Sequence, residues 1–387
     1  MRSAAVAVIG AGVMGASVAW HLAARGRRDV VVLDRAGTPG MGSTGRATGG
    51  FRAQYGTPIN VRLSLLARDR LLRFREETGV DPGYVPAGYL WLATTPAELA
   101  ALGAARAIQQ AEGLREAVEV SPGEIAELNP AVRLDGVVGG AFCPSDGFIR
   151  PLAIIEGYLA AAARSGARVE CGVEVTGMRR ERDGRITAVE TSRGPLAVGA
   201  VVNAAGPWAA GVAAMAGVAL PVTPLRRQVA VTAPSDLLPA GMPMTIWVGD
   251  GFHLRVRDGR VLLLWPTPGV PGRPFEASVD PAWMDAVAAM AHARVPGLRR
   301  VPIDRDACAA GLYEMSPDKH AILGAAPRCP NQYLINGSSG HGVMHAPALG
   351  QLLAEIMCDG RASSLEVSGL DPGRFERGAA NPVPELL

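Results

Sequence analysis

The feature that most constrains this chain is a glycine-rich turn near its start, set between two apolar runs. Residues 5–9 (Ala-Val-Ala-Val-Ile) and 30–34 (Val-Val-Val-Leu-Asp) are continuously apolar before the final acid. Such runs are typical of parallel strands that are buried on both faces. Gly10, Gly12 and Gly15 follow the first run directly. The order predicts a strand, a sharp turn, a helix and a second strand.

Each residue of this turn has a physical role if the unit binds a dinucleotide. Gly10 permits the tight turn, Gly12 lets a pyrophosphate approach the backbone, and Gly15 lets the helix pack closely on the strand. The helix predicted over residues 13–25 points its free N–H groups at the phosphates. Asp34, at the end of the second strand, is placed to accept hydrogen bonds from a ribose. The motif alone does not separate NAD from FAD.

Two later segments repeat the pattern of a strand followed by small residues and a helix. A strand predicted over 197–202 leads into Asn203–Trp208, and a strand over 332–336 leads into a glycine-rich turn. That turn is followed by a helix that reaches about Met357, with Pro347 expected in its first turn. An NAD domain is usually one contiguous block, so these separated units favour a longer cofactor that distant parts of the chain contact.

The intervening parts predict a second, mostly antiparallel domain. Residues 84–146 combine a short strand over 89–92 with an alanine-rich helix over 97–112. Strands are also predicted over residues 229–232, 252–256 and 261–264, with Asp258-Gly259 as a hairpin turn between the last two. The predicted fold class is α/β, or α+β overall.

Composition excludes several functional classes. The net charge is +2 and no block of like charge stands out, so nucleic-acid binding is not expected. The five cysteines are far apart with no Cys-x-x-Cys pair, and His341 and His345 have no acidic partner in their turn, so we expect no metal site. A reducing cytoplasm fits this cysteine usage. Residues 4–20 are uncharged, but their glycines argue against a targeting segment, and no other run is long enough to span a membrane.

Four motifs spread over the chain carry a family resemblance. They are the glycine turn with Asp34, Ser43-Thr-Gly-Arg-Ala-Thr-Gly-Gly-Phe-Arg52-Ala-Gln-Tyr-Gly, Val202-Asn-Ala-Ala-Gly-Pro-Trp208, and Gly311-Leu-Tyr-Glu-Met-Ser-Pro-Asp318 with Gly337–Pro347. On these motifs the chain resembles the FAD-dependent amine oxidoreductases of the D-amino-acid oxidase superfamily. It is most similar to sarcosine oxidases, dimethylglycine dehydrogenases and the β subunits of dye-linked proline dehydrogenases.

The resemblance implies a Rossmann-like FAD-binding domain interleaved with an antiparallel-sheet substrate-binding domain. The first comprises residues 1–83, 147–221 and 307–375, and the second comprises residues 84–146 and 222–306. The residues that it places at FAD are Gly10, Ala11, Gly12, Val13, Met14, Gly15, Asp34, Arg35, Ser43, Thr44, Arg46, Val175, Ala204, Ala205, Gly206, Trp208, Gly311, Gly340, His341, Gly342, Val343 and Met344.

It also implies four residues at the substrate. Arg52 occupies the position of an arginine that binds the substrate carboxylate, which suits a guanidinium because it can donate two parallel hydrogen bonds. Tyr313 lies at a position beside the substrate, and His253 falls near an aromatic active-site position. Met344 stands where sarcosine oxidases place a lysine against the carboxylate. The alternatives are an exposed arginine, a tyrosine packed in the core and a structural histidine.

The chain departs from the family pattern at several positions, so some properties of the family are not expected here. Gly311 and Arg46 stand where some relatives have the cysteine or histidine that attaches FAD, so we expect FAD to bind without a covalent bond. Lys319 is the only lysine, and no lysine stands at the position that activates oxygen in sarcosine oxidases. This absence favours a dehydrogenase over an oxidase.

The predicted function is therefore oxidation of the C–N bond of a secondary or N-methylated amino acid, such as sarcosine, dimethylglycine or proline. The substrate would be a small anionic amine, and its hydride would pass to flavin N5 with an imine as product. The alternatives are oxidation of a D-amino acid or 2-hydroxy acid on the same scaffold, or an FAD-binding accessory subunit without turnover. The electron acceptor and any partner subunit are left open.

Overall fold

The apolar run at the start of the chain forms the centre of a parallel sheet in the computed structural model, which describes residues 2–268 and 273–383. β1 (Arg2–Ile9) lies between β11 (Leu196–Asn203) and β2 (Val30–Asp34) and is parallel to both. The strand–helix–strand unit that the sequence predicts is thereby confirmed.

Alternate side chains of β1 enter two different cores. Val6 and Val8 pack with the helices on one face of the sheet, while Ala7 and Ile9 pack into the cluster on the other face. From Val6 to Ile9 every position of the strand is apolar because neither face meets water there.

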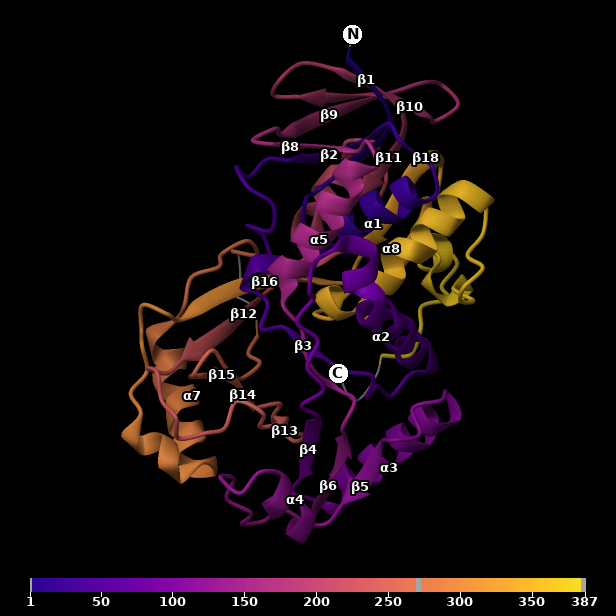
Figure 1. Cartoon of the computed structure of the whole chain (residues 1–387). Helices are drawn as coiled ribbons and strands as arrows, with labels where there is room; N and C mark the ends of the chain where they lie inside the picture. The colour runs from indigo at the N-terminus through magenta and orange to yellow at the C-terminus, as the bar shows by residue number, and fades with distance from the viewer. Residues whose placement is uncertain (1, 269–272, 384–387) are drawn as a thin grey trace.

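The first sheet has the strand order β17-β18-β11-β1-β2-β8, and β10 and β9 extend it from β11 as an antiparallel pair (Figure 1). Five neighbouring strands, β18 to β8, run parallel, and β17 is antiparallel to β18. The strands not yet given bounds are β8 (Arg168–Cys171), β9 (Val175–Arg180), β10 (Ile186–Thr191), β17 (Ile322–Ala326) and β18 (Cys329–Asn336).

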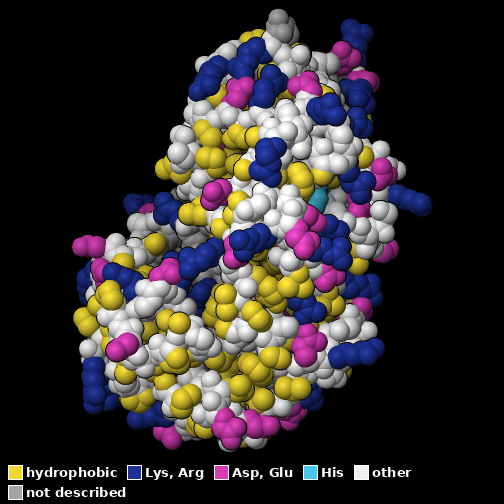
Figure 2. All heavy atoms as spheres, in the orientation of Figure 1, with side chains coloured by type: hydrophobic (Ala, Val, Ile, Leu, Met, Phe, Trp, Pro, Cys, Tyr) yellow, Lys and Arg dark blue, Asp and Glu magenta, His cyan; other side chains and the backbone are white. Residues whose placement is uncertain are grey.

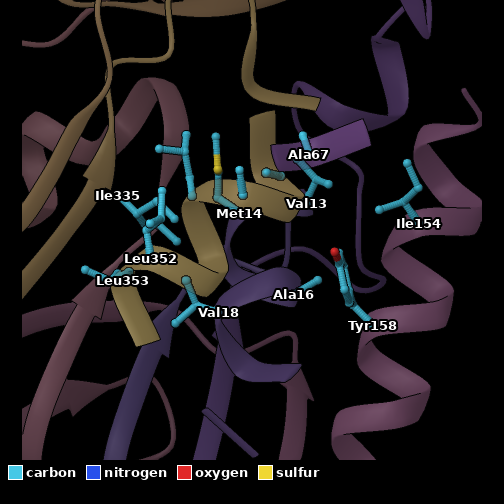
Figure 3. Close-up of a cluster of buried hydrophobic side chains, with 14 of the residues drawn as sticks. Val13, Met14, Ala16, Val18, Ala67, Ile154, Tyr158, Ile335, Leu352 and Leu353 are labelled. Atoms are coloured by element: carbon cyan, nitrogen blue, oxygen red, sulfur yellow. The ribbon is translucent and has the colours of Figure 1, made fainter. Parts of the chain in front are cut away.

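Four helices cover one face of this sheet. They are α1 (Val13–Ala24), α2 (Pro58–Thr78), α5 (Pro151–Arg164) and α8 (Gly342–Asp359). Figure 3 shows Ala16 of α1 between Tyr158 of α5 and Leu352 of α8. Because α1 is enclosed by helices and sheet, almost all of its side chains are buried, and the helix has no polar face.

The prediction for Pro347 is wrong. α8 begins at Gly342, so Pro347 lies inside the helix and not in its first turn. Proline removes a backbone hydrogen bond and normally disfavours such a position. Here the helix is buried from Met344 to Glu355, and Ser17 Oγ donates a hydrogen bond to the carbonyl of Ala346 at 2.7 Å. Tertiary packing therefore overrides the local preference.

The second sheet has the order β16-β12-β15-β14-β13-β4-β6-β5 and is antiparallel except where β13 and β4 pair (Figure 1). Its strands are β4 (Tyr89–Ala93), β5 (Val118–Val120), β6 (Gly139–Cys143), β12 (Thr223–Val231), β13 (Met244–Trp247), β14 (His253–Arg257), β15 (Arg260–Leu264) and β16 (Ala309–Met315). Its helices are α3 (Pro96–Ala111), α4 (Pro122–Leu128) and α7 (Pro281–Arg294).

One strand, β16, belongs to the second sheet, whereas the predicted domain division implies the first. β16 falls within the predicted FAD-binding segment 307–375, but it pairs antiparallel with β12 along its whole length, from Thr223↔Met315 to Val229↔Ala309. The chain crosses to the first sheet only at the turn that follows, before β17. In each of the other predicted segments, the long strands all belong to the sheet of the domain to which that segment was assigned. This agreement supports the division into two domains, which stays a prediction.

The remaining elements are short. A two-stranded sheet joins β3 (Gly50–Phe51) to β7 (Gly147–Phe148), and α6 (Ala209–Ala214) follows β11. Short 3-10 helices occupy 44–46, 206–208, 296–300, 368–370 and 372–374.

Charged side chains of both signs are interspersed over the face that Figure 2 shows, with no region of a single sign. Among the described helices, none combines the length and the apolar character that crossing a bilayer would require.

Candidate active site

A cavity of about 840 Å³ lies where the two sheets meet. It is lined by the start of α1, the end of β2 and residues 40–50 from the N-terminal part of the chain. The turn after β11, residues of β4, β12, β13, β14 and β16, and the turn before α8 also line it. Segments more than 300 residues apart in sequence therefore meet around one space, as the separated motifs predict.

The glycine turn has the geometry that its sequence predicts. Gly10 has φ +111°, a conformation that side-chain-bearing residues rarely adopt. A Cβ on Gly15 would overlap the carbonyl oxygen of Gly10, so α1 can lie this close to β1 only with glycine at that position. Gly12 lines the cavity, and a Cβ there would point toward Thr44 Oγ1 at 3.3 Å. Gly15 thus acts through packing and does not line the cavity.

Asp34 holds the glycine turn in place. Its Oδ2 accepts a hydrogen bond from the Ala11 N–H at 2.7 Å, and its Oδ1 accepts one from the Ala36 N–H at 2.8 Å. The N–H of Ala11 is thereby used within the protein, and Ala11 does not line the cavity. Asp34 itself does, so a hydrogen bond to a ribose remains a prediction.

Two other predicted cofactor residues bind the backbone of β16. Ser43 Oγ donates to the Leu312 carbonyl at 2.6 Å, and Arg46 Nη1 donates to the Ala310 carbonyl at 2.7 Å. Both residues also line the cavity. They therefore join the segment after β2 to the second sheet across the site.

A stack of side chains lies at the end of β2. The Arg35 guanidinium lies 4.4 Å from the ring centre of Trp208, and Phe275 stacks on the same ring at 6.0 Å. All predicted cofactor residues other than Ala11 and Gly15 line the cavity, including Val175 and the turn from Ala204 to Gly206. Their contacts with a cofactor stay predictions.

The turn before α8 completes one wall. Gly340 has φ +96°, and a Cβ there would overlap the ring of Tyr313. The residues from Gly340 to Met344 line the cavity, so the first turn of α8 directs its positive dipole end at this space. The first turn of α8 reaches the cavity because the helix begins at Gly342, five residues before Pro347.

Arg52 is buried, with 5% of its surface exposed, and it faces the cavity. Its guanidinium lies between two aromatic rings, 4.5 Å from the centre of Tyr55 and 4.9 Å from that of Trp91. Among described residues it makes one hydrogen-bond contact, to His341 Nε2 at 3.5 Å, and no ion pair. Since a guanidinium has five N–H donors, most of its capacity is left for a ligand.

The other predicted substrate residues lie in the same cavity. Burial lowers the pKa of His253 to about 4, and its Nδ1 lies 2.8 Å from the Gly251 carbonyl, so the ring is neutral with Nε2 as acceptor. Burial raises the pKa of Tyr313. Met344 Sδ accepts the Tyr55 hydroxyl at 2.9 Å, so the thioether packs against the residue that clamps Arg52.

His341 and His345 are both buried at the start of α8. Burial and the neighbouring Arg52 lower the pKa of each, to about 3 for His345, whose Nε2 lies 2.9 Å from Ser64 Oγ. Tyr55 packs against both rings. Among described residues no group of three potential metal ligands forms, at this pair or elsewhere.

Sequence reasoning missed four residues at this site. Trp91 of β4 and Arg227 of β12 line the cavity. Glu314, which also lines it, has a carboxyl whose pKa burial raises to about 7. Asp146 lies behind Arg52, and burial raises the pKa of its carboxyl to about 7 as well. The aromatic alternation Tyr89-x-Trp91 was a usable signal, because period-two spacing places both rings on one face of a strand.

Comparison with known proteins agrees with this architecture. The family model for FAD-dependent oxidoreductases (DAO) matches residues 5–356. The chain is 29% identical over 389 residues to dimethylglycine dehydrogenase of Homo sapiens, an alignment that covers 95% of this chain and 44% of that protein. It is 29% identical over 361 residues to glycine oxidase of Geobacillus kaustophilus, covering 91% and 92% of the two chains. The chain thus spans less than half the length of the dimethylglycine dehydrogenases that it matches.

Solved structures give the same result. L-proline dehydrogenase from P. horikoshii superposes with a TM-score of 0.91 at 29% identity, covering 98% of this chain and 100% of that one. Glycine oxidase from Geobacillus kaustophilus superposes with a TM-score of 0.84 at 26% identity, covering 97% and 99%. Because the family model extends over most of the sequence and the fold agrees throughout, this protein belongs to the DAO family of FAD-dependent oxidoreductases.

Proposed function

We propose that this protein oxidises the C–N bond of an amino acid whose nitrogen is secondary or N-methylated. The observation that carries the proposal is Arg52, a buried cation that lines the cavity without a carboxylate partner among described residues. An unpaired buried charge is costly, and the cost is offset when an anionic ligand binds. The aromatic clamp leaves the edge of the guanidinium free for two parallel hydrogen bonds to a carboxylate.

The residues of the cavity fit the family's cofactor. The open glycine cradle at Gly10 and Gly12 leaves room for a pyrophosphate, and Asp34, next to the Arg35–Trp208 stack, would accept hydrogen bonds from the ribose. The N-terminal end of α8 faces the cavity and would stabilise negative charge on a bound flavin ring. FAD, when bound, supplies the hydride acceptor. We propose that it binds non-covalently, since Gly311 and Arg46 offer no attaching nucleophile.

The side chains of this chain bind and orient the substrate. Arg52 holds the carboxylate, and the rings of Tyr89, Trp91 and Tyr313 form apolar walls that exclude water. The positive charge of the arginines disfavours a bound ammonium ion and so favours the neutral amine. The α-carbon of a neutral amine can then lose a hydride while the nitrogen lone pair forms the C=N bond. Loss of the hydride leaves an iminium ion, which water hydrolyses to a carbonyl compound and an amine with release of a proton.

The relatives support the class of substrate. They include dimethylglycine dehydrogenase, sarcosine dehydrogenase and a 4-methylaminobutanoate oxidase. The structural neighbour with a TM-score of 0.91 is an L-proline dehydrogenase. All of these names describe substrates with a secondary or N-methylated amine and a carboxylate.

Anaerobic reduction of the flavin tests the proposal. A panel of secondary and N-methylated amino acids, D-amino acids and 2-hydroxy acids is added to the holoprotein, and loss of the flavin absorbance is followed. We expect secondary or N-methylated amino acids to bleach the flavin. Arg52→Ala should lose about 2–4 kcal/mol of substrate selectivity, roughly 30- to 1000-fold, because it removes a charged hydrogen-bonded pair.

The matched control is the amide of the same substrate, which has no carboxylate for Arg52 to hold. Arg52→Ala should slow reduction by the acid far more than reduction by the amide. Equal losses for both would contradict a role in carboxylate binding. Bleaching only by D-amino acids or 2-hydroxy acids would establish the alternative chemistry. No bleaching over the whole panel would favour an accessory subunit.

We also propose that electrons pass to an acceptor other than oxygen, such as a partner subunit or a soluble carrier. The only lysine of the chain, Lys319, is not among the residues that line the cavity. Mixing the reduced protein with oxygenated buffer in a stopped-flow instrument should show slow reoxidation. A fast oxygen reaction would indicate an oxidase.

A further inference from the structure

A second arginine that lines the cavity has no charge partner within the part of the chain that the structure describes. Arg227 of β12 lines the cavity, and its Nη1 donates to the carbonyls of Thr267 at 2.6 Å and Arg226 at 3.3 Å. It forms no ion pair with any described residue, and Nε and Nη2 have no described hydrogen-bond partner. Arg227 is half-buried, and this burial lowers the pKa of its guanidinium.

Arg227 and Arg52, which lie on different elements, both affect the same two side chains of the cavity. The Arg227 guanidinium lies 5.6 Å from the ring centre of Tyr313. The positive charges of Arg52 and Arg227 both lower the pKa of Tyr313 against the effect of burial, and both contribute to the lowered pKa of His253. The tyrosine and the histidine are therefore within the electrostatic reach of both guanidinium groups.

The carboxylates that line the cavity do not balance these two charges. Asp250 is paired with Arg294 at 2.6 Å, and Asp34 holds backbone N–H groups in the glycine turn. Glu174, which also lines the cavity, is exposed to solvent. Glu314 accepts the Ser338 N–H at 3.4 Å, and the rise of its pKa to about 7 leaves it partly protonated near neutrality. Lys319, whose pKa burial and the neighbouring Arg227 lower, adds further positive charge nearby.

We propose that the substrate pocket is built for a dianion, namely a secondary or N-substituted amino acid that carries a second carboxylate. Arg52 holds one carboxylate and Arg227 holds the other, with the amine between them. This inference rests on the proposed function and narrows its substrate class from any amino acid of that kind to dicarboxylic ones.

The test measures binding and needs no turnover. The probes are thiodiacetate and methylthioacetate, which place a sulfur where an amine would be and differ by one carboxylate. Each is titrated into the FAD-loaded protein, and the perturbation of the flavin absorbance gives its Kd. We expect thiodiacetate to bind roughly 10- to 150-fold more tightly, the range of one added charged hydrogen-bonded contact. Equal affinities of the two probes would overturn the proposal.

Variants assign the preference to one side chain. Arg227→Met should abolish the preference for thiodiacetate and leave methylthioacetate binding nearly unchanged. The matched control is Arg226→Met, the adjacent arginine on the same strand, which does not line the cavity and donates to the Ser278 carbonyl. Arg227→Gln, which keeps a donor for the Thr267 carbonyl, replaces the methionine variant if the latter does not fold. An equal loss of preference in Arg226→Met would show a diffuse field and overturn the assignment.

Failure of this inference is distinguishable from failure of the proposed function. If amino acids with one carboxylate bleach the flavin as efficiently as dicarboxylic ones, the pocket is not selective for dianions although the enzyme class stands. If no amine bleaches the flavin but thiodiacetate still binds selectively through Arg227, the proposed reaction is wrong and the dianion site remains.

Discussion

Arg52 and Arg227 differ in what holds each guanidinium in place. Arg52 is clamped by two aromatic rings, and the backbone that follows it is bound to a buried carboxyl: Asp146 accepts the Ala53 N–H at 2.6 Å and the Gln54 N–H at 3.4 Å. Arg227 is held only by carbonyl oxygens at one end of its guanidinium. Asp146 is therefore a positioning residue, which acts on the substrate through the segment that carries Arg52.

Asp146→Asn should weaken substrate binding more than it slows hydride transfer. The neutral amide holds the two backbone N–H groups less strongly, so Arg52 is less well oriented toward the carboxylate. We expect KM to rise about tenfold, equivalent to ~1.4 kcal/mol, with kcat changed less than about threefold. Asp135→Asn, at an exposed aspartate far from the cavity, serves as the control. A fall in kcat as large as the rise in KM would argue against a positioning role.

At the scale of elements, two helices begin at the same cavity. α1 starts at Val13, within the glycine turn, and α8 starts at Gly342, so both direct a positive dipole end at the cavity. The approach of α1 depends on Gly15, which lies against the carbonyl of Gly10. The position of the whole helix thus depends on the absence of one methyl group.

Gly15→Ala should reduce retention of FAD although Gly15 does not line the cavity. The added methyl group would push α1 away from β1 and distort the turn at Gly10. We expect FAD affinity to fall at least about tenfold, measured as flavin bound per polypeptide during titration of the apoprotein. Gly103→Ala is the matched control, because this glycine lies within α3 with open space around it. That variant should bind FAD normally and gain about 0.5–1 kcal/mol of stability.

At the scale of the whole molecule, the site exists only because the two sheets meet along it. The first sheet contributes the glycine turn and the start of α8, and the second contributes Trp91, Arg227 and His253. The crossing between the sheets is the turn after β16, and a buried ion pair holds this turn. Asp318 binds Arg374 through two hydrogen bonds of 2.8 and 2.9 Å, and both side chains are at most 2% exposed.

Asp318→Asn should destabilise the protein by about 3–5 kcal/mol, because it leaves the Arg374 charge buried and unpaired. Thermal or urea unfolding measures the loss. The control is Arg377→Ala, which breaks the exposed pair with Asp371 and should cost no more than about 1 kcal/mol. A similar loss of unfolding free energy in both variants would show that the buried pair stabilises the protein no more than the exposed one.

The same pair sets a pH dependence of stability. Burial alone would raise the pKa of Asp318, but Arg374 and Asn381 lower it below its ordinary value. Because the folded-state pKa lies below the unfolded value of about 3.9, the stabilisation is complete well above that pH and is lost as the pH falls through the folded-state pKa. Asp318→Asn should therefore flatten the acid limb of a plot of unfolding free energy against pH.

The local sequence predicted the features that depend on local geometry. The turn at Gly10–Gly15 and the buried strands around it were expected from the local sequence. The placement of Arg52, Tyr313 and His253 at one site was implied only by the family resemblance. The start of α8 was misplaced, because Pro347 normally opens a helix and only the burial of α8 overcomes that preference. Glu314 and Asp146 escaped notice because a carboxyl shows its burial only in the folded chain.

The amino-acid order by itself determined the dinucleotide turn, the doubly buried strands and the family, because backbone conformation and side-chain spacing are properties of short segments. Only the tertiary structure decided that β16 joins the second sheet and that Arg227 lines the same cavity as Arg52. The alternation of a strand tells which residues share a face but not what that face meets. Whether a charge lacks a partner depends on every segment folded around it, and for Arg227 those segments come from both ends of the chain.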